Sequence, residues 1–386
     1  MTFLPRVLHY SSKSGLLRSI LTGVSMKTVC LFIGDITRCG GTERMTSLLA
    51  NELVNHTPYR VLILSLTERS QTAFFELDPR VFRFALYKKD HHYRLMLPFT
   101  RRRLASFLRR QQVDVLIDVD VILSTASAAA VNKVKCKWIA WEHFHFYENL
   151  GVPLRDRGRT LAKQYADAIV TLTKADALQY QETPVRGSVV PIYNALIPHT
   201  PSDSGSPEDK PFILSVGRLD HQKGFDRIPA MAEHILARFP EYNWIILGEG
   251  RYRRLIEEEL RRRDLADRVK LPGRRDPYDY YKHASLLVMP SRYEGFGLVL
   301  LEAMSEGCPA VAFDCKIGPS EMIRDGENGY LAPAEDIPAM EEKILALLND
   351  PELRRTFADN AKKISTEFSV QTFTEKWIDC INGVLK

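Results

Sequence analysis

The stretch ASLLVMPSRYEGFGLVLLEAM, residues 284–304, contains a complete strand, loop and helix signal. An apolar run that ends at Pro290 predicts a buried strand, and the apolar run after Gly297 predicts a buried helix. Glu294 lies in the loop, eight residues before Glu302. Because a carboxylate inside an apolar helix is costly without partners, the pair indicates a ligand site where a parallel strand ends.

Short apolar runs, most of them bounded by Gly or Pro, alternate with helical patterns along the chain. This alternation is typical of parallel sheets covered by helices, so the fold class is α/β. The predicted strands are 27–34, 60–66, 113–119, 137–141, 167–172, 211–217, 243–248, 268–273, 284–290 and 309–313.

The chain of 386 residues is long for one hydrophobic core, which favours two domains. A stretch rich in Pro, Ser and Asp, PHTPSDSGSPEDK at 198–210, predicts the linker between them. We expect an extension at 1–25, domains at 26–197 and 211–365, and a final helix at 366–386 that packs back toward the first domain.

Composition narrows the class of protein. Hydrophobic content of 45% with 26% charged residues is typical of a soluble globular enzyme, and no apolar run approaches the roughly 18 residues of a membrane span. The six cysteines are scattered without a Cys-x-x-Cys, which predicts reduced thiols in a cytoplasmic protein. Residues 1–200 hold 27 Lys and Arg but 16 Asp and Glu, so this half suits an anionic partner or has an uneven solvated surface. We expect no nucleic-acid partner.

Two loops carry features that suit phosphate. Gly40 and Gly41 follow the first predicted strand, and they allow backbone amides at a helix N-terminus to approach an anion. The alternative is a plain tight turn. In SVGRLDHQKGFD, Arg218 and Lys223 occupy one short loop after a strand and could clamp a diphosphate. The alternative is two surface cations.

The stretch 284–304 and the loop at Gly273 and Arg274 supply the other groups of the predicted ligand site. With a helix that starts near Gly297, its first amides face any anion held there, and Glu302 can accept two hydroxyls from a vicinal diol such as ribose. The loop at Gly273 and Arg274 can meet a base edge. The alternatives are a buried structural glutamate at Glu302 and an ordinary loop acid at Glu294.

The spacing of Glu294 and Glu302 resembles the E-x7-E motif of glycosyltransferase family 4, whose members are retaining enzymes with the GT-B fold and include bacterial enzymes of surface polysaccharide and lipopolysaccharide synthesis. The similarity extends through SVGRLDHQKG, LGEG, GRRDPYDYY, GPSEMIRDGENGYL and PIYNAL, so it spans the chain from about Met26 to the end. The resemblance implies two Rossmann-like domains that face each other across a cleft.

The resemblance also implies a role for each residue. Arg218, Lys223, Gly40, Gly41, Gly297 and Leu298 would bind the donor diphosphate, Glu302 the ribose, and Arg274 the nucleobase. Glu294, Gly295, Phe296 and Gly297 would hold the donor sugar, with Glu294 catalytic. His143, in WIAWEHFHF, would be the second catalytic residue, the histidine near the sugar, with His145 as the second choice.

The function implied is transfer of a hexose or N-acetylhexosamine from a nucleotide sugar, UDP-linked first and GDP-mannose second, to a saccharide or lipid-linked saccharide acceptor. No metal or cofactor is expected, although Asp118 and Asp120 form a D-x-D and His143 and His145 could begin a metal site. The alternatives are a glycosidase with two carboxylates, a UDP-sugar 2-epimerase, and a nucleotide-sugar-binding module without catalysis.

The stretch PFTRRRLASFLRRQQ at 98–112 predicts a basic amphipathic helix. Five arginines surround the apolar residues Leu104, Phe107 and Leu108 at helical spacing. The resemblance implies peripheral contact with the inner face of an anionic cytoplasmic membrane through this helix. The alternative is a solvated helix face.

Overall fold

The structure is a computed structural model that describes residues 26–90, 92–199 and 205–386. The extension predicted at 1–25 and the middle of the predicted linker, 200–204, lie outside the described residues. The chain divides into two compact units. Unit 1 contains the described chain up to Trp141 together with Arg157–Ala168 and Ile378–Lys386, and unit 2 contains Glu142–Asp156 and Ile169–Trp377. The domain limits given above stay predictions.

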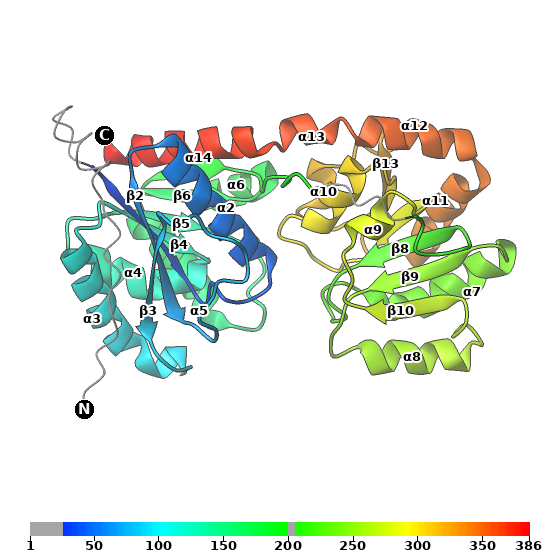
Figure 1. The fold of residues 1–386 in the computed structure, drawn as a ribbon, viewed down its shortest axis with the longest axis horizontal. Coiled ribbons are helices and arrows are strands. Elements are labelled where there is room, and N and C mark those ends of the chain that lie inside the picture. Colours follow the sequence, from blue (N-terminus) through cyan, green and yellow to red (C-terminus); the bar gives the residue numbers. More distant parts are fainter. Residues whose placement is uncertain (1–25, 91, 200–204) are drawn as a thin grey trace. The chain divides into compact units, whose positions relative to one another are not determined.

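The first sheet has seven strands in the order β3-β2-β1-β4-β5-β6-β7 (Figure 1). Its interior strand β1 is buried at all six residues, which explains why every residue of the strand after Thr28 is apolar. Val29 pairs in parallel register with Val61 on one side and Val115 on the other. The strands are β1 (Thr28–Ile33), β2 (Arg60–Thr67), β3 (Phe82–Tyr87), β4 (Val115–Val119), β5 (Lys137–Trp141), β6 (Ala168–Thr171) and β7 (Ser188–Pro191).

The second sheet has six strands in the order β10-β9-β8-β11-β12-β13, and its paired strands are parallel. Its core packs Trp244, Phe225 and Phe313 with aliphatic side chains of the covering helices. The strands are β8 (Phe212–Val216), β9 (Asn243–Leu247), β10 (Val269–Gly273), β11 (Leu286–Met289), β12 (Ala310–Asp314) and β13 (Gly329–Pro333).

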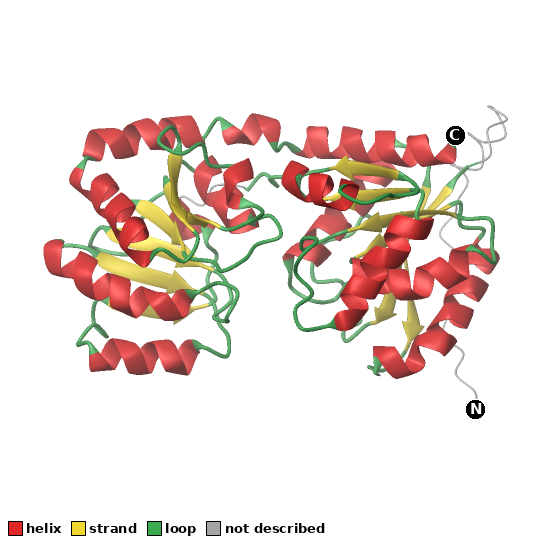
Figure 2. Cartoon of the chain, turned by 180° about the vertical axis from the view of Figure 1, so that it is seen from behind, coloured by secondary structure: helices red, strands yellow, loops and turns green. Residues whose placement is uncertain are grey.

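Helices lie on both sides of each sheet (Figure 2). Those of the first half of the chain are α2 (Gly41–His56), α3 (Tyr93–Gln111), α4 (Ser124–Val131), α5 (Pro153–Tyr165) and α6 (Lys174–Gln181). Those of the second half are α7 (Ile228–Arg238), α8 (Arg253–Arg262), α9 (Tyr278–Tyr281), α10 (Leu298–Ser305), α11 (Ile337–Asn349), α12 (Pro351–Ala361), α13 (Ile364–Glu367) and α14 (Val370–Leu385).

The strand order shows where each sheet can bind a ligand. In the second sheet the chain runs outward from β8 to β10 and then returns to β11 on the other side of β8, so β8 and β11 form the switch point. Loops that follow such strands diverge and leave a crevice at the carboxyl edge of the sheet. The loop of Arg218 and Lys223 follows β8, and the loop of Glu294 follows β11. β1 and β4 are the switch point of the first sheet.

Helix α3 corrects one expectation about the membrane-facing surface. Leu104, Phe107 and Leu108, expected among the arginines of the exposed face, are at most 5% exposed and pack in the core. The large apolar side chains that α3 exposes are Leu95 and Phe99, one turn apart near its N-terminus. The predicted helix is present, but its apolar stripe of Leu104, Phe107 and Leu108 packs against the core of the unit and does not face the solvent.

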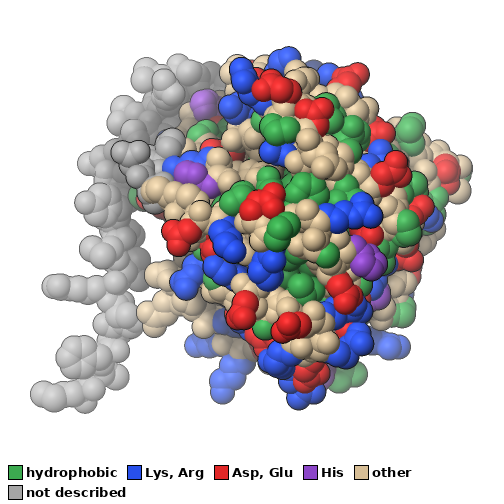
Figure 3. Space-filling view, turned by 90° about the vertical axis from the view of Figure 1, so that its right-hand side faces the viewer, with side chains coloured by type: hydrophobic (Ala, Val, Ile, Leu, Met, Phe, Trp, Pro, Cys, Tyr) green, Lys and Arg blue, Asp and Glu red, His purple; other side chains and the backbone are tan. Residues whose placement is uncertain are grey.

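Basic and acidic side chains are interspersed over the face shown in Figure 3. On α8 this mixing follows from ion pairs between residues four apart, such as Arg253 with Glu257 and Arg254 with Glu258. Such pairs add only a few tenths of a kcal/mol each. None of the described helices is both long and apolar enough to cross a membrane.

Candidate active site

The centre of the candidate site is an ion pair between the loops after β8 and β11. Lys223 Nζ lies 2.7 Å from Glu294 Oε1, and both side chains are largely buried. Ser291 Oγ donates to the same oxygen at 2.6 Å. A buried carboxylate needs such partners, and a buried lysine needs the carboxylate. The structure thus brings together two residues that the sequence placed in separate loops.

Glycines allow these loops to approach each other. Gly224 has φ 68°, and a Cβ there would stand 2.1 Å from the carbonyl oxygen of Pro290. Gly297, at φ 100°, is the N-cap of α10. The predicted helix start near Gly297 is confirmed, and the first-turn amides, with no capping side chain, suit an anion.

Arg218 lies on the same loop as Lys223 but is mostly exposed. Its guanidinium donates to Gln222 Oε1 at 2.8 Å, and its Nε lies 3.3 Å from Asp220. Gln222 in turn donates to the carbonyl of Tyr293 at 3.3 Å, which ties the loop after β8 to the loop after β11. Arg218, Asp220, Gln222 and Tyr293 line an open cavity of about 450 Å³.

Glu302 lies in α10 and is 6% exposed. The hydroxyl of Tyr281, at the end of α9, donates to Glu302 Oε2 at 3.1 Å. Burial raises the pKa of Tyr281 well above its ordinary value, so this hydroxyl stays a donor. Sequence reasoning missed Tyr281, because nothing in DYYKHA distinguishes a tyrosine that orients a carboxylate from one that fills the core.

Arg274 is exposed immediately after β10. Gly273, at φ 82°, turns the chain there, and its carbonyl accepts from the amide of Gly248 at 2.9 Å. The loops after β9 and β10 are therefore joined at the edge of the sheet that carries the other candidate residues.

His143 and His145 follow β5 and are both buried. Burial lowers the pKa of His143 to about 3, with Glu142 opposing that shift and Arg155 adding to it. The imidazole is therefore neutral at pH 7 and suits hydrogen bonding better than proton transfer. The carbonyl oxygen of His143 lies 2.6 Å from the position of a Cβ on Gly295, so only glycine fits there.

The first turn of helix α2 contains an acid, Glu43, beside the glycine loop of unit 1. Helix α2 begins at Gly41, and a Cβ on Gly40 would stand 2.4 Å from Glu43 Oε2. This carboxylate, 8% exposed, therefore lies beside the amides expected to meet a phosphate. Burial raises its pKa.

The D-x-D of the first sheet has a structural explanation. Asp118 is fully buried and accepts from Ser124, Ser127 and the indole of Trp138 at 3.1, 2.5 and 2.8 Å. Burial raises its pKa to about 7, because these three donors do not offset the loss of water. Asp120 caps a short helical turn through the amide of Ile122. Within the described ranges, no three His, Cys, Asp or Glu side chains are grouped as a metal site.

Comparison with known proteins identifies the family. The profile described as "Glycosyl transferases group 1" matches residues 197–364, and that described as "Glycosyltransferase Family 4" matches 39–198. An uncharacterized glycosyltransferase of Haemophilus influenzae is 31% identical over 355 residues, which cover 91% of this chain and 99% of that protein. The amylovoran biosynthesis glycosyltransferase AmsD of Erwinia amylovora is 26% identical over 92% of this chain and all of its own.

Solved structures agree on the fold. A sucrose-phosphate synthase from Thermosynechococcus elongatus has a TM-score of 0.78 at 19% identity, with 93% of this chain and 99% of that chain covered. The Anabaena protein HepE, solved with UDP and glucose, has a TM-score of 0.75 at 21% identity, with 93% and 100% covered. These structures and the two parallel sheets establish the GT-B fold. The chain belongs to glycosyltransferase family 4 and is itself a glycosyltransferase.

Proposed function

We propose that the protein is a retaining glycosyltransferase that moves a hexose or N-acetylhexosamine from a UDP-sugar to a saccharide or lipid-linked saccharide during surface glycan synthesis. The observation that carries the proposal is the contact of Lys223 and Ser291 with one oxygen of Glu294 at the β8–β11 switch point. This contact supports the proposal, because it joins a cation suited to a leaving diphosphate and a carboxylate suited to sugar hydroxyls.

In the proposed donor complex, Lys223 and Arg218 hold the diphosphate with the amides of Gly297 and Leu298. Glu302, oriented by Tyr281, accepts the ribose hydroxyls, and the Arg274 loop meets the base. Glu294 holds the donor sugar together with the amides of Gly295 and Phe296. The neutral His143 hydrogen-bonds the sugar. No metal or cofactor takes part in this proposal.

These groups match the charges that develop during transfer. The bond between the sugar C1 and the diphosphate oxygen breaks, which leaves positive charge on the sugar and negative charge on the diphosphate. Cations and helix amides fixed in advance stabilise that negative charge without reorganisation. An acceptor oxygen forms the new bond to C1 on the same face, and its proton passes to the departing phosphate.

Relatives support the donor and acceptor classes. One named for transfer of N-acetyl-D-galactosamine to a saccharide on diphospho-undecaprenol, from Campylobacter jejuni, is 26% identical over 92% of this chain and 98% of its own. The AmsD relative is named for amylovoran biosynthesis. The solved HepE structure holds UDP and glucose.

We propose cytoplasmic peripheral association with an anionic membrane through α3. Leu95 is 74% exposed and Phe99 56% exposed on its first turns, and the exposed Arg94 and Arg102 lie beside them. Apolar side chains that enter the acyl boundary, together with cations at the headgroups, are the features of an interfacial helix.

The test of the proposed function follows the nucleotide and the anomeric proton together. The protein is incubated with UDP-glucose, UDP-galactose or UDP-N-acetylglucosamine, alone and with octyl glycoside acceptors, and the products are followed by ¹H NMR. We expect acceptor-dependent UDP release with an axial α-glycoside from these α-linked donors. A β-glycoside would overturn retention, an altered UDP-sugar would indicate the alternative 2-epimerase, and binding without turnover would indicate the alternative binding module.

A further inference from the structure

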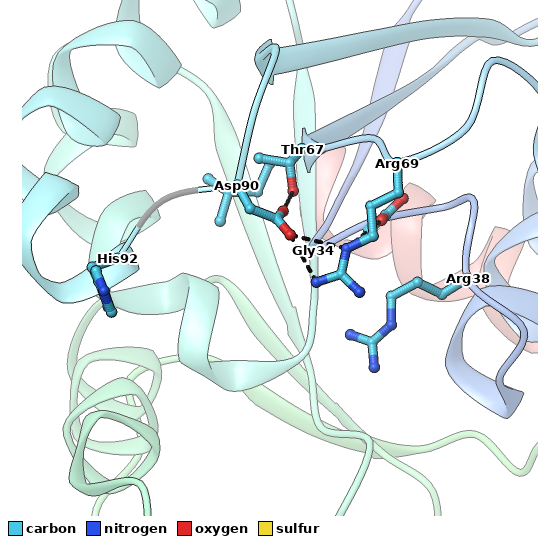
Figure 4. Close-up of a pocket in the computed structure, with 8 residues that line it drawn as sticks. Gly34, Arg38, Thr67, Arg69, Asp90 and His92 are labelled. Atoms are coloured by element: carbon cyan, nitrogen blue, oxygen red, sulfur yellow. Dashed lines mark hydrogen bonds and ion pairs between the residues drawn. The ribbon is translucent and has the colours of Figure 1, made fainter.

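Unit 1 contains two adjoining cavities at the carboxyl ends of its first three strands. The first, of about 480 Å³, is lined by the last residues of β2 and by residues that follow β1, β2 and β3 (Figure 4). The second, of about 910 Å³, lies between the end of β3 and helix α3. Arg69 and Asp90 line both, so the two cavities share a wall.

The first cavity contains a buried carboxylate oxygen without a hydrogen bond. Asp35 is 5% exposed, and its Oδ1 accepts from the amide and hydroxyl of Thr37 at 2.9 and 2.6 Å. Its Oδ2 has no hydrogen bond to the described residues, and the nearest cation, Arg69 Nε, is 4.0 Å away. Such an oxygen is costly to bury, so the cavity offers an acceptor for a ligand hydroxyl.

The charges of the first cavity are balanced. Arg69 bonds the carboxylate of Asp90 at 2.9 and 2.8 Å, and Thr67 donates to the other oxygen of Asp90 (Figure 4). Arg38 is exposed, and although its backbone amide donates to the carbonyl of Asp35 at 3.4 Å, its guanidinium has no hydrogen bond or ion pair with the described residues. One acceptor at Asp35 and one donor at Arg38, in a site without net charge, suit the hydroxyls of a neutral sugar.

The second cavity is cationic. It is lined by Arg69, Lys88, Lys89 and Arg103 against two acids, Glu68 and Asp90. Both acids are already engaged, Glu68 with Arg83 at 2.8 Å and Asp90 with Arg69.

Two of its cations are available to an anion. Arg103 is fixed over the ring of Tyr87 at 4.4 Å and donates to the carbonyl of Leu86 at 2.9 Å. Neither Arg103 nor Lys88 has an acidic partner within the described ranges. A cation held in place beside a flexible one suits a phosphate group.

We propose that these two cavities together bind a sugar joined to a phosphate, with the sugar on Asp35 and Arg38 and the phosphate on Lys88 and Arg103. The ligand is the acceptor of the transfer, and this assignment rests on the proposed function. The shared wall of Arg69 and Asp90 marks the junction between the sugar and its phosphate. The phosphate belongs either to a lipid carrier or to a water-soluble phosphodiester chain.

The test is saturation-transfer NMR on the whole protein with UDP at saturation, so that UDP fills the donor diphosphate site. The two probes are methyl α-glucosyl phosphate and methyl α-glucoside, which differ only by the phosphate. We expect the phosphate probe to bind the wild type about tenfold more tightly, which is the scale of one charge-assisted contact. Equal binding of the two probes overturns the proposal.

Variants assign each cavity. Lys88→Glu should remove the preference for the phosphate probe and leave the neutral probe unchanged, whereas Lys135→Glu, an exposed lysine of the same unit, should change neither. Asp35→Asn should weaken both probes, with its fold checked by circular dichroism. Equal effects of the two lysine variants overturn the cationic assignment even if Asp35→Asn does not fold.

Two further measurements distinguish a failure of this inference from a failure of the proposed function, and a lipid carrier from a water-soluble chain. Transfer from a UDP-sugar to octyl glycosides tests the proposed function alone, so active enzyme without phosphate preference defeats only this inference. Octyl and glyceryl esters of glucosyl phosphate distinguish the sources, since tighter octyl binding indicates a lipid carrier and equal binding a water-soluble chain. Either result supports a phosphate-linked sugar.

Discussion

The Nζ of Lys223 lies 2.7 Å from Oε1 of Glu294, so the cation expected to meet the donor diphosphate is paired with the carboxylate expected to meet the donor sugar. Each neutralises the other while both are largely buried. In the proposed reaction, an arriving donor must offer its diphosphate to Lys223 and its hydroxyls to Glu294. The pair therefore holds both groups near their working positions before the donor binds.

Glu294→Ala should reduce transfer by about 10²–10³-fold, the scale of one lost electrostatic contact in a transition state. UDP binding should change little, because Lys223 keeps its position on the loop. The measurements are kcat with the best donor and UDP affinity by calorimetry. Glu306→Ala, which removes a half-buried acid just after α10, is the matched control. Normal turnover by Glu294→Ala would show that the central assignment is wrong.

Tyr281→Phe should weaken UDP binding by about tenfold, because Glu302 loses the hydroxyl that orients it. Glu302→Ala should weaken UDP binding further and should not affect binding of inorganic pyrophosphate. Calorimetry with the two ligands separates these effects. Tyr280→Phe removes the neighbouring hydroxyl and should behave as the wild type. Equal losses for UDP and pyrophosphate would contradict a role at the ribose.

The strands missing from the sequence prediction share one property: all three are sheet edges. β3, β7 and β13 pair on one side only, and their burial is partial, so they lack the continuous apolar run of β1 or β4. Strands that are buried on both faces can be recognised from their continuous apolar composition. The fourth edge strand, β10, is also only partly buried and was nevertheless predicted, so partial burial weakens the sequence signal of an edge strand without always removing it.

In the candidate site, too, some residues could be predicted from local sequence and others could not. Motif spacing revealed Lys223, Glu294 and Glu302 because each interrupts a regular pattern next to glycine or apolar residues. Ser291, Gln222 and Tyr281, which hold these groups through hydrogen bonds, were missed because their role depends on contacts between separate loops. The apolar stripe of α3 was detected, but which side of the helix meets the core follows only from packing.

Leu95→Ser with Phe99→Ser should reduce binding to vesicles with anionic lipid by about tenfold or more, because two exposed apolar side chains are lost. Arg102→Glu should reduce binding mainly at low salt, where charge attraction is least screened. Co-sedimentation with vesicles of phosphatidylglycerol and phosphatidylethanolamine measures both. Leu178→Ser, at an equally exposed leucine of α6, is the control. Unchanged vesicle binding by the double variant would rule out this surface.

The stability of unit 1 should depend on pH through the titration of Asp118. Its pKa is about 7 in the fold against an ordinary value of 3.8, so the folded state holds the proton more tightly than the unfolded state. The stability that this proton contributes is fully present below pH 3.8 and is lost as pH rises through about 7.

Asp118→Asn removes that titration, so the stability of the wild type relative to this variant should fall by up to about 4 kcal/mol between pH 4 and pH 7. Hydrogen exchange of the β4 amides, compared between the two proteins at each pH, measures this difference within unit 1. The same comparison with Asp267→Asn, at an exposed position, should give no such slope. A wild-type advantage that stays constant across this range would mean that Asp118 is already ionised in the fold and that its three donors outweigh its burial.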